Sequence, residues 1–282
     1  MKLHKETAEI FIPDQTNETE ALSRTTHLCI AAHQDDIEIM SAQPIIECFQ
    51  NEDKWFTGVI MTDGRSSPRK GAYLHTTDED MRLIRFAEQC KAAVIGEYSA
   101  LISLDYPSTE IKDGTKEEPV DDLLQILRIT RPKFVYTHNL ADKHDTHVGV
   151  ALRVIKALRS LDQNERPEKV LGCEVWRSLD WINDPDKVVL DVSSHTNLQH
   201  ELLGVFNSQI NGGKRYDLAA MGRRQVNATF FESHGVDTAT GLSFAIDLTP
   251  LMEDNSLHPS DYINEFIQRF EKDVTNRINR MS

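Results

Sequence analysis

The chain has no long apolar run and few basic residues, and each of these features excludes some classes of function. No apolar run reaches about 18 residues, which a membrane-spanning helix requires. Lys and Arg total 31 against 45 Asp and Glu, so the formal charge is −14. This charge argues against nucleic acids and anionic membrane surfaces as main partners, because both select for clustered Lys and Arg. It favours a neutral or cationic small-molecule substrate, although the charge of a local pocket can override the net charge.

Cysteine is scarce, and a dinucleotide-binding fingerprint is missing. The four cysteines are far apart in apolar segments and form no Cys-x-x-Cys pair, which excludes a thiolate zinc site of the usual spacing. Reduced core thiols are typical of a cytoplasmic protein, and the polar start of the chain carries no signal-peptide core. We therefore predict a cytoplasmic location. No Gly-x-Gly-x-x-Gly follows the first apolar strand, so a nucleotide-type fold here does not imply a nucleotide ligand.

Apolar strands alternate with amphipathic helices along the chain, which predicts an α/β fold: a Rossmann-like, mostly parallel sheet flanked by helices. We expect strands at 27–32, 55–61, 100–104, 134–136, 170–176, 188–192 and 244–248. We expect helices at 37–50 (kinked by Pro44), 78–95, 120–130, 144–161, 198–209, 217–231 and 262–281. The predicted organisation is an N-terminal arm with an edge strand (1–25), one α/β domain (26–250), and a C-terminal helix packed on the same domain (251–282).

Two clusters of imidazoles and carboxylates each follow a predicted strand. Residues 32–36 read Ala-His-Gln-Asp-Asp, and residues 144–147 read His-Asp-Thr-His at the start of a helix. Parallel sheets hold their ligands beyond the carboxyl ends of the strands, so the two clusters are expected at one edge. Catalytic zinc is commonly held by three His or acidic ligands with one position left open. Together the clusters predict a zinc site.

The spacing suggests a role for each group. His33 and Asp36, three residues apart in a tight turn, can face one point, and His147 is the natural third metal ligand. Asp35 is then free beside the metal and suits a general base, although an Asp at this place can also act only as a helix N-cap. His144 lies about one helical turn before His147 and could stabilise charge on a carbonyl oxygen or donate a proton.

Other polar residues near strand ends are weaker candidates. Asp63 and Arg65 follow the second strand and are candidates for substrate contacts, although Asp63 also suits a simple turn. Asp142 is a third substrate candidate and can alternatively orient an imidazole. Arg85 and Glu88 have the spacing of an exposed pair on a helix. That helix is expected to bury a face that contains Met81, Ile84, Ala87 and Val94.

The motifs resemble those of the LmbE-like, or PIG-L, zinc deacetylases. The family shows Ala-His-Pro-Asp-Asp after its first strand, and residues 32–36 match with Gln34 in place of Pro. It also shows an Asp-x-His-x-Asp-His cluster, and residues 142–147 match with Thr146 in place of the second Asp. The resemblance covers roughly residues 26–232. A later His-x-Ser-Gln pattern stands as Phe206-Asn-Ser-Gln here, which indicates a divergent subgroup.

The resemblance implies one zinc ion per chain, with other divalent metals compatible, held by His33, Asp36 and His147. It implies Asp35 as the base and His144 as the charge-stabilising imidazole. The activity implied is hydrolysis of an N-acetyl group on an N-acetylglucosamine-type sugar or conjugate, by a chain that could form a homo-oligomer. Two alternatives stay open: a metal-dependent phosphoester hydrolase, with Arg65, Arg69 and Lys70 as a phosphate clamp, and a non-catalytic sugar-binding module. Specificity is expected in residues 65–75 and 178–241.

Overall fold

The computed structural model describes all 282 residues. Its strands are β1 (Glu9–Phe11), β2 (His27–Ala31), β3 (Phe56–Thr62), β4 (Ala100–Tyr106), β5 (Phe134–His138), β6 (Lys169–Cys173), β7 (Val188–Asp191) and β8 (Leu242–Asp247). Its helices are α1 (Glu18–Ser23), α2 (Asp36–Met40), α3 (Ala42–Cys48), α4 (Asp78–Ile95), α5 (Ser108–Lys112), α6 (Glu118–Thr130), α7 (Asp145–Arg159), α8 (Thr196–Gly204), α9 (Asn207–Ile210), α10 (Tyr216–Phe230), α11 (Thr249–Glu253) and α12 (Pro259–Met281). Short 3₁₀ turns occupy Gly71–Tyr73, Gln163–Glu165 and Asp184–Asp186.

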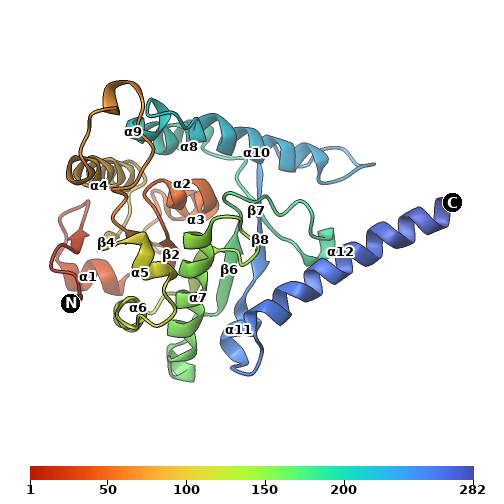
Figure 1. Cartoon of the computed structure of the whole chain (residues 1–282), viewed down its shortest axis with the longest axis horizontal. Coiled ribbons are helices and arrows are strands. Elements are labelled where there is room, and N and C mark those ends of the chain that lie inside the picture. The colour runs from red at the N-terminus through yellow and green to blue at the C-terminus, as the bar shows by residue number, and fades with distance from the viewer.

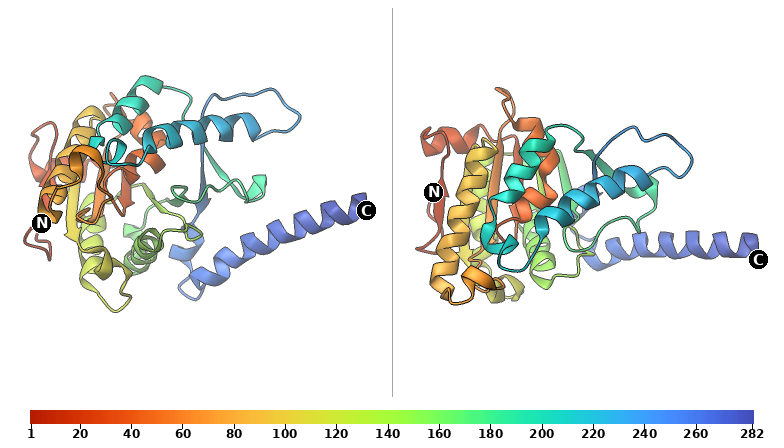
Figure 2. Two further views of the ribbon diagram at one scale, coloured as in Figure 1. Left: turned by 45° about the horizontal axis from the view of Figure 1, so that its top comes forward. Right: turned by 90° about the horizontal axis from the view of Figure 1, so that it is seen from above.

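All eight strands form one sheet in the order β1-β4-β3-β2-β5-β6-β8-β7. The five strands from β4 to β6 are parallel, while β1 and β8 pair antiparallel at the two sides. Helices cover both faces of the sheet (Figures 1 and 2). The predicted α/β fold with a mostly parallel sheet is thus confirmed, and β1 is the edge strand expected in the N-terminal arm.

Alternating side chains of the central strands supply two cores. Leu28 and Ile30 of β2 face the larger core, which α6, α7 and α11 close. Cys29 and Ala31 face the second core, which α2, α3, α4 and α8 close. Both faces of β2 are therefore apolar, which is the pattern of a strand in the middle of a parallel sheet. This rigid strand ends at the residues of the first predicted metal cluster.

The predicted helix at 37–50 is two helices. α2 ends at Met40 and α3 begins at Ala42, so the break lies at Ser41 rather than at Pro44. Pro44 has no N–H to donate to the carbonyl of Met40, so a continuous helix would lose that hydrogen bond. Pro44 instead occupies the first turn of α3, where a missing N–H costs nothing.

The buried face of α4 differs from the predicted one. Ala87 and Val94, expected in the core, are exposed. Met81 is buried as expected, but Arg85 and Glu88 are buried beside it at 2% and 4% exposure. The predicted exposed pair of Arg85 and Glu88 is therefore wrong, because these side chains turn inward and find polar partners on other elements. The face of α4 that packs on the sheet is therefore partly polar, and it extends to the edge at which the parallel strands end.

The C-terminal helix packs on the domain only through its first part. Phe266 is its one buried residue, and Tyr262 and Ile263 pack with it against the larger core. Beyond Phe270, whose ring contacts Trp181 at 6.1 Å between centroids, α12 extends away from the body (Figure 2). None of the helices combines the length and the apolar character needed to cross a membrane.

Candidate active site

The first cluster lies in a tight turn at the carboxyl end of β2. Asp35 adopts φ +89° at the start of α2, a conformation unusual for a residue with a side chain. The turn is closed by Asp36, whose Oδ2 accepts the backbone N–H of His33 at 2.8 Å. From the neighbouring strand β5, His138 accepts the backbone N–H of Ala32 at Nε2 (2.8 Å). His138 therefore helps to hold this turn in place through the backbone of Ala32.

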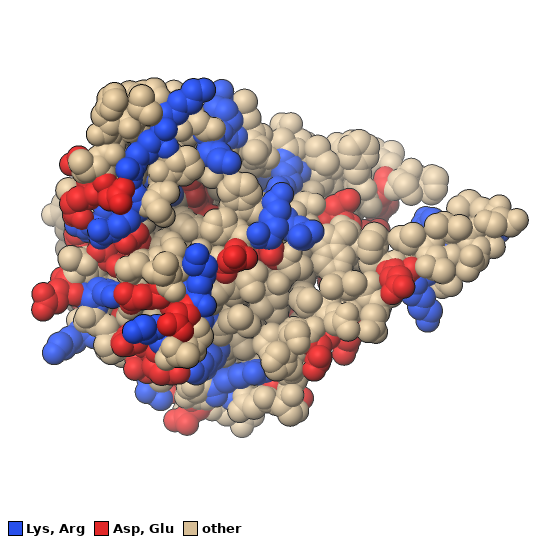
Figure 3. Space-filling view, viewed as in Figure 1, with Lys and Arg blue, Asp and Glu red and all other residues tan.

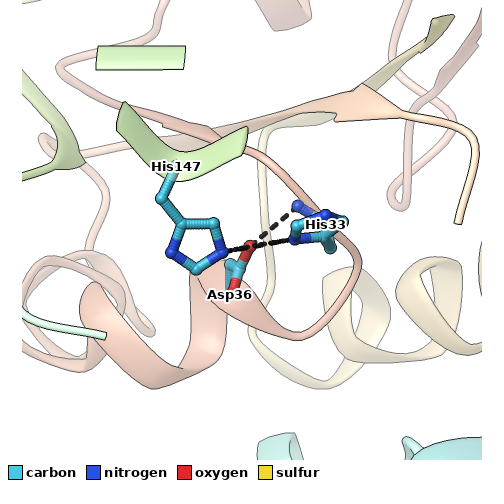
Figure 4. A group of neighbouring side chains, drawn as sticks. All are labelled: His33, Asp36 and His147. Carbon is cyan, nitrogen blue, oxygen red and sulfur yellow. Dashed lines mark hydrogen bonds and ion pairs between the residues drawn. The ribbon is translucent and has the colours of Figure 1, made fainter. Parts of the chain in front are cut away.

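Three side chains from two distant parts of the chain converge at this turn. Figure 4 shows His33 and Asp36 beside His147, which projects from the first turn of α7. Asp36 Oδ2 lies 3.1 Å from His33 Nδ1 and 3.2 Å from His147 Nε2, and the two nitrogens are 3.3 Å apart. A tetrahedral ion with bonds of about 2.0–2.1 Å separates its ligand atoms by about 3.3 Å. These three atoms therefore fit the ligand positions of one small divalent cation.

The charges at this cluster also suit a cation. Burial disfavours a charged His147, yet Asp36 and Asp142 overcome it and raise the pKa of this imidazole to about 9. Burial disfavours a charged Asp36 as well, but His147 and His33 hold the pKa of this carboxyl well below its usual range. The carboxylates thus stabilise positive charge at the point where the three ligand atoms meet. Two imidazoles and one carboxylate are a donor set that zinc and other first-row metals accept.

Asp35 lies beside this cluster and is nearly buried, with 4% exposure. Burial raises the pKa of Asp35 to about 8, and Arg85 opposes the rise. The guanidinium of Arg85 is 3.5 Å from Asp35 Oδ2 and also donates to the carbonyl of Gln34. Gln89 accepts the backbone N–H of Asp35 at 3.1 Å. The side chain of Asp35 is therefore held at the metal cluster without taking part in it.

His144 also lies beside the cluster. Its ring stacks on His147 with centroids 4.6 Å apart and meets His33 at 5.0 Å. Burial and the neighbouring His147 lower the pKa of His144 to about 4, so the ring is neutral at neutral pH. A neutral imidazole in this position can donate one hydrogen bond into the adjacent space.

Asp142 acts on the backbone and on an imidazole. Its carboxylate accepts the backbone N–H groups of His144 at 3.0 Å and Trp176 at 3.1 Å, and lies 3.4 Å from His147 Nδ1. Carboxylates that face the far nitrogen of a ligating imidazole fix its orientation. The sequence predicts that Asp142 either contacts the substrate or orients an imidazole, and this contact corresponds to the second role.

Asp63 and Arg65 lie farther out, at the end of β3. Arg65 Nε donates to Asp63 Oδ2 at 2.6 Å, and Arg65 also pairs with Glu79 at 3.7 Å. Neither residue lines the pocket described next. A substrate contact by either one stays a prediction.

A pocket of about 740 Å³ opens above the cluster. His33, Asp35, Asp36 and His144 form its floor, and the loop after β3, α5, α7 and the segment from α9 to α10 form its walls. The sequence did not assign Trp176 to the site, and it placed Lys214, Tyr216 and Arg223 only within the segment expected to set specificity (178–241). Arg85 and Gln209 also line the pocket. Trp176 and Tyr216 meet at 6.0 Å between ring centroids and give one wall an aromatic surface.

The segment with the altered family pattern helps to build this wall. Glu88 of α4 accepts the backbone N–H of Ser208 at 2.7 Å and its hydroxyl at 2.6 Å. Phe206 is buried in the second core instead of offering an imidazole. Gln209, the next residue after Ser208, lines the pocket. The Arg-x-x-Glu spacing on α4 was therefore the available signal for these contacts, and it was interpreted as a surface pair.

Solved structures share this fold. The conserved protein TT1542 from Thermus thermophilus aligns with a TM-score of 0.60 at 17% identity, covering 79% of this chain and 94% of that one. An N,N'-diacetylchitobiose deacetylase from Pyrococcus horikoshii aligns at 0.59 and 17% identity, covering 78% and 83%. GalB, a 4-carboxy-2-hydroxymuconate hydratase from Pseudomonas putida, aligns at 0.59 and 16%, covering 79% and 96%. At such identities the likeness establishes the fold alone.

Sequence comparison finds one matching family. No curated protein matches the chain. Residues 28–158 match the PIG-L family, described as GlcNAc-PI de-N-acetylase. This range contains both imidazole and carboxylate clusters, as the resemblance of the motifs implied. Residues 28–158 are therefore similar to the PIG-L family.

Proposed function

We propose that the chain is a metal-dependent N-deacetylase that hydrolyses the acetamide of an N-acetylglucosamine-type sugar or conjugate. The family match supports this reaction class. The single observation that carries the proposal is the convergence of His33, Asp36 and His147 within 3.3 Å of one another, with His33 and Asp36 on the floor of the pocket.

His33, Asp36 and His147 would hold the ion, and zinc is the metal that we propose. A divalent ion bound there supplies Lewis acidity, which polarises an amide carbonyl and makes water a stronger acid. Asp142 keeps the ring of His147 turned towards this position through the contact at its far nitrogen. His138 keeps the turn of His33 in place through the backbone of Ala32.

Asp35 and His144 both line the pocket beside this position and would divide the proton transfers. Asp35 is the general base: its carboxylate takes the proton of the attacking water, and its burial favours the protonated form that results. His144 donates a hydrogen bond to the carbonyl oxygen as negative charge develops there. One such donor is worth about 3 kcal/mol or more in the transition state. The proton held on Asp35 then passes to the leaving amine.

Two observations argue against the alternative function, a metal-dependent phosphoester hydrolase. Two members of the expected phosphate clamp are already paired with carboxylates: Arg65 with Asp63 at 2.6 Å and Arg69 with Asp78 at 2.6 Å. The second possible ligand group shares His147 with the first, so the cluster offers one full metal position rather than two. A single metal position suits amide hydrolysis better than a two-metal phosphoester mechanism.

The test is a panel of N-acetylated sugars and sugar conjugates, with release of free amine followed by mass spectrometry with and without a chelator. We expect turnover that the chelator abolishes. Asp35→Asn should keep the metal and lose turnover by about 10³-fold or more, since it removes the base.

Asp105→Asn is the matched control. Asp105 is also buried, also has positive φ (+57°) and also pairs with an arginine, Arg82 at 3.4 Å, but it lies outside the pocket. It should keep its turnover. Equal turnover in Asp35→Asn and the wild type would remove Asp35 from the mechanism, and amine release that persists without metal would contradict the proposed reaction.

A further inference from the structure

The pocket is basic although the protein is acidic. Only two carboxylates line it, Asp35 and Asp36, and both belong to the catalytic floor. Six cationic side chains line it: Arg85, Lys112, Lys143, Lys214, Arg215 and Arg223. On the face shown in Figure 3, Lys and Arg side chains lie near the middle of the molecule, with carboxylates among them. This local charge is opposite in sign to the net charge of −14, from which a neutral or cationic substrate was expected.

Most of these cations have no carboxylate partner. Lys112, Lys143 and Lys214 form no ion pair, although acidic residues outnumber basic ones in the chain as a whole. Arg223 donates to the backbone carbonyl of Val175 and likewise has no carboxylate partner. Surface cations in an acidic protein usually find carboxylates nearby, as Arg215 does with Asp217 at 2.7 Å. Unpaired cations that converge on one cavity repel one another, so a bound anion would stabilise them.

Lys214 connects this charge to the catalytic floor. Its Nζ lies 5.0 Å from the centre of the Trp176 ring, and that ring lies 6.0 Å from the ring of His144. Arg223 is anchored next to Trp176, at the carbonyl of Val175. Lys214 and Arg223 therefore both lie next to Trp176, whose ring in turn neighbours His144, and an aromatic face of this kind can stack on a sugar ring.

We infer that the substrate carries an anionic group, a phosphate or a carboxylate, on the acylated sugar, and that Lys214, Arg223 and Lys143 bind this anion beside Trp176. The inference rests on the proposed deacetylase function, because it assumes that the acetamide lies on the metal cluster. Lys214, Arg223 and Trp176 all lie beyond residues 28–158, so the family match does not assign them a role.

The test compares sugars that differ only in charge. Deacetylation of methyl N-acetylglucosaminide is measured beside N-acetylglucosamine 1-phosphate and the 1-O-carboxymethyl glycoside, at low and high salt. We expect kcat/KM at least tenfold higher for an anionic sugar than for the neutral one, with a preference that shrinks as salt screens the charges. The phosphate and carboxylate arms identify which anion is preferred.

Reversing the charge of Lys214 tests where the anionic group of the substrate binds. Lys214→Glu should reduce the ratio of anionic to neutral kcat/KM at least tenfold, mainly through KM. Lys272→Glu, an exposed lysine on α12 outside the pocket, should leave the ratio at the wild-type value. If the ratio is near one in the wild type, or is the same in Lys214→Glu, the anion subsite is refuted while the deacetylase function stands.

A binding measurement separates the two proposals. Glucosamine 1-phosphate and glucosamine are titrated into wild-type protein and Lys214→Glu by calorimetry, which requires no turnover. Binding of the phosphate that depends on Lys214, with no deacetylation of any sugar, supports the anion subsite and contradicts the proposed reaction. Equal binding of both compounds contradicts the subsite.

Discussion

Gln89 should hold the general base in place. Its Oε1 accepts the backbone N–H of Asp35 at 3.1 Å, and its Nε2 donates to Glu38 Oε1 at 2.7 Å. The hydroxyl of Tyr98 donates to the same oxygen of Glu38 at 2.7 Å. Gln89 is 1% exposed, so water cannot replace these contacts. This chain of hydrogen bonds is what secures Asp35 at φ +89°, and Gln89→Leu removes its central member.

The expected loss can be worked out from these contacts. Gln89→Leu leaves the N–H of Asp35 buried without a partner, which costs about 1–3 kcal/mol. Glu38 loses one of its two side-chain donors, and a hydrogen bond to a charged group contributes about 1.5–3 kcal/mol. The added apolar burial of Leu offsets part of this. We expect the free energy of unfolding to fall by about 3 kcal/mol, and kcat by about 10²-fold, because a base displaced by about 1 Å costs that much.

The assay is urea unfolding of the metal-free protein together with kcat on the best substrate of the panel. Gln43→Leu is the matched control, because Gln43 also donates to a glutamate, Glu47 at 2.6 Å, but is only half-buried and distant from the pocket. It should cost less than about 1 kcal/mol and leave kcat unchanged. If Gln89→Leu unfolds at the same urea concentration as the wild type, the proposed hydrogen-bond chain does not stabilise the turn.

Three further outcomes are expected. His147→Ala should lose the metal in elemental analysis, whereas retained metal would exclude His147 as a ligand. Gly64→Ala should lower the free energy of unfolding by about 1–3 kcal/mol, because Gly64 has φ +68° and an added Cβ would lie 2.3 Å from Gln34 Oε1; Gly114→Ala, with open space around it, serves as the control, and equal costs would reject the steric argument. Deleting residues 271–282 should shift the thermal midpoint by less than about 3 °C, since these residues are not buried, and a larger drop in calorimetry would show that they contribute to the core.

The sheet and the convergence of His33, Asp36 and His147 could be predicted because both depend on local patterns. A buried strand in a parallel sheet is a short apolar run, and β2 and β5 have this form. The two strands pair directly, so residues that follow them meet although His33 and His147 are 114 positions apart. The observation that each cluster follows a strand is then enough to predict that the ligands lie at the same edge of the sheet.

The face of α4 could not be predicted in this way. Helix periodicity assigns apolar residues to the core and charged residues to water. Arg85, Glu88 and Gln89 break that rule because their partners come from elsewhere in the chain: the turn at Asp35 and the segment at Ser208. A buried charge is tolerated only with such partners, and a single helix sequence does not reveal them. The misassigned residues are the ones that support the site.

The charge of the pocket was missed for a related reason. Net charge is a sum over the whole chain, whereas a ligand responds to the potential inside one cavity. The cations of this cavity come from the end of α5, the loop before α7 and the first turns of α10, and they meet only in the folded protein. The family-matched part contains the proposed metal ligands and the proposed base, while Lys214, Arg223 and Trp176 come from the unmatched part. In the proposed scheme the reaction and the choice of substrate therefore depend on different parts of the sequence, so relatives that keep residues 32–36 and 144–147 but change the wall around Trp176 should share the reaction and differ in substrate charge.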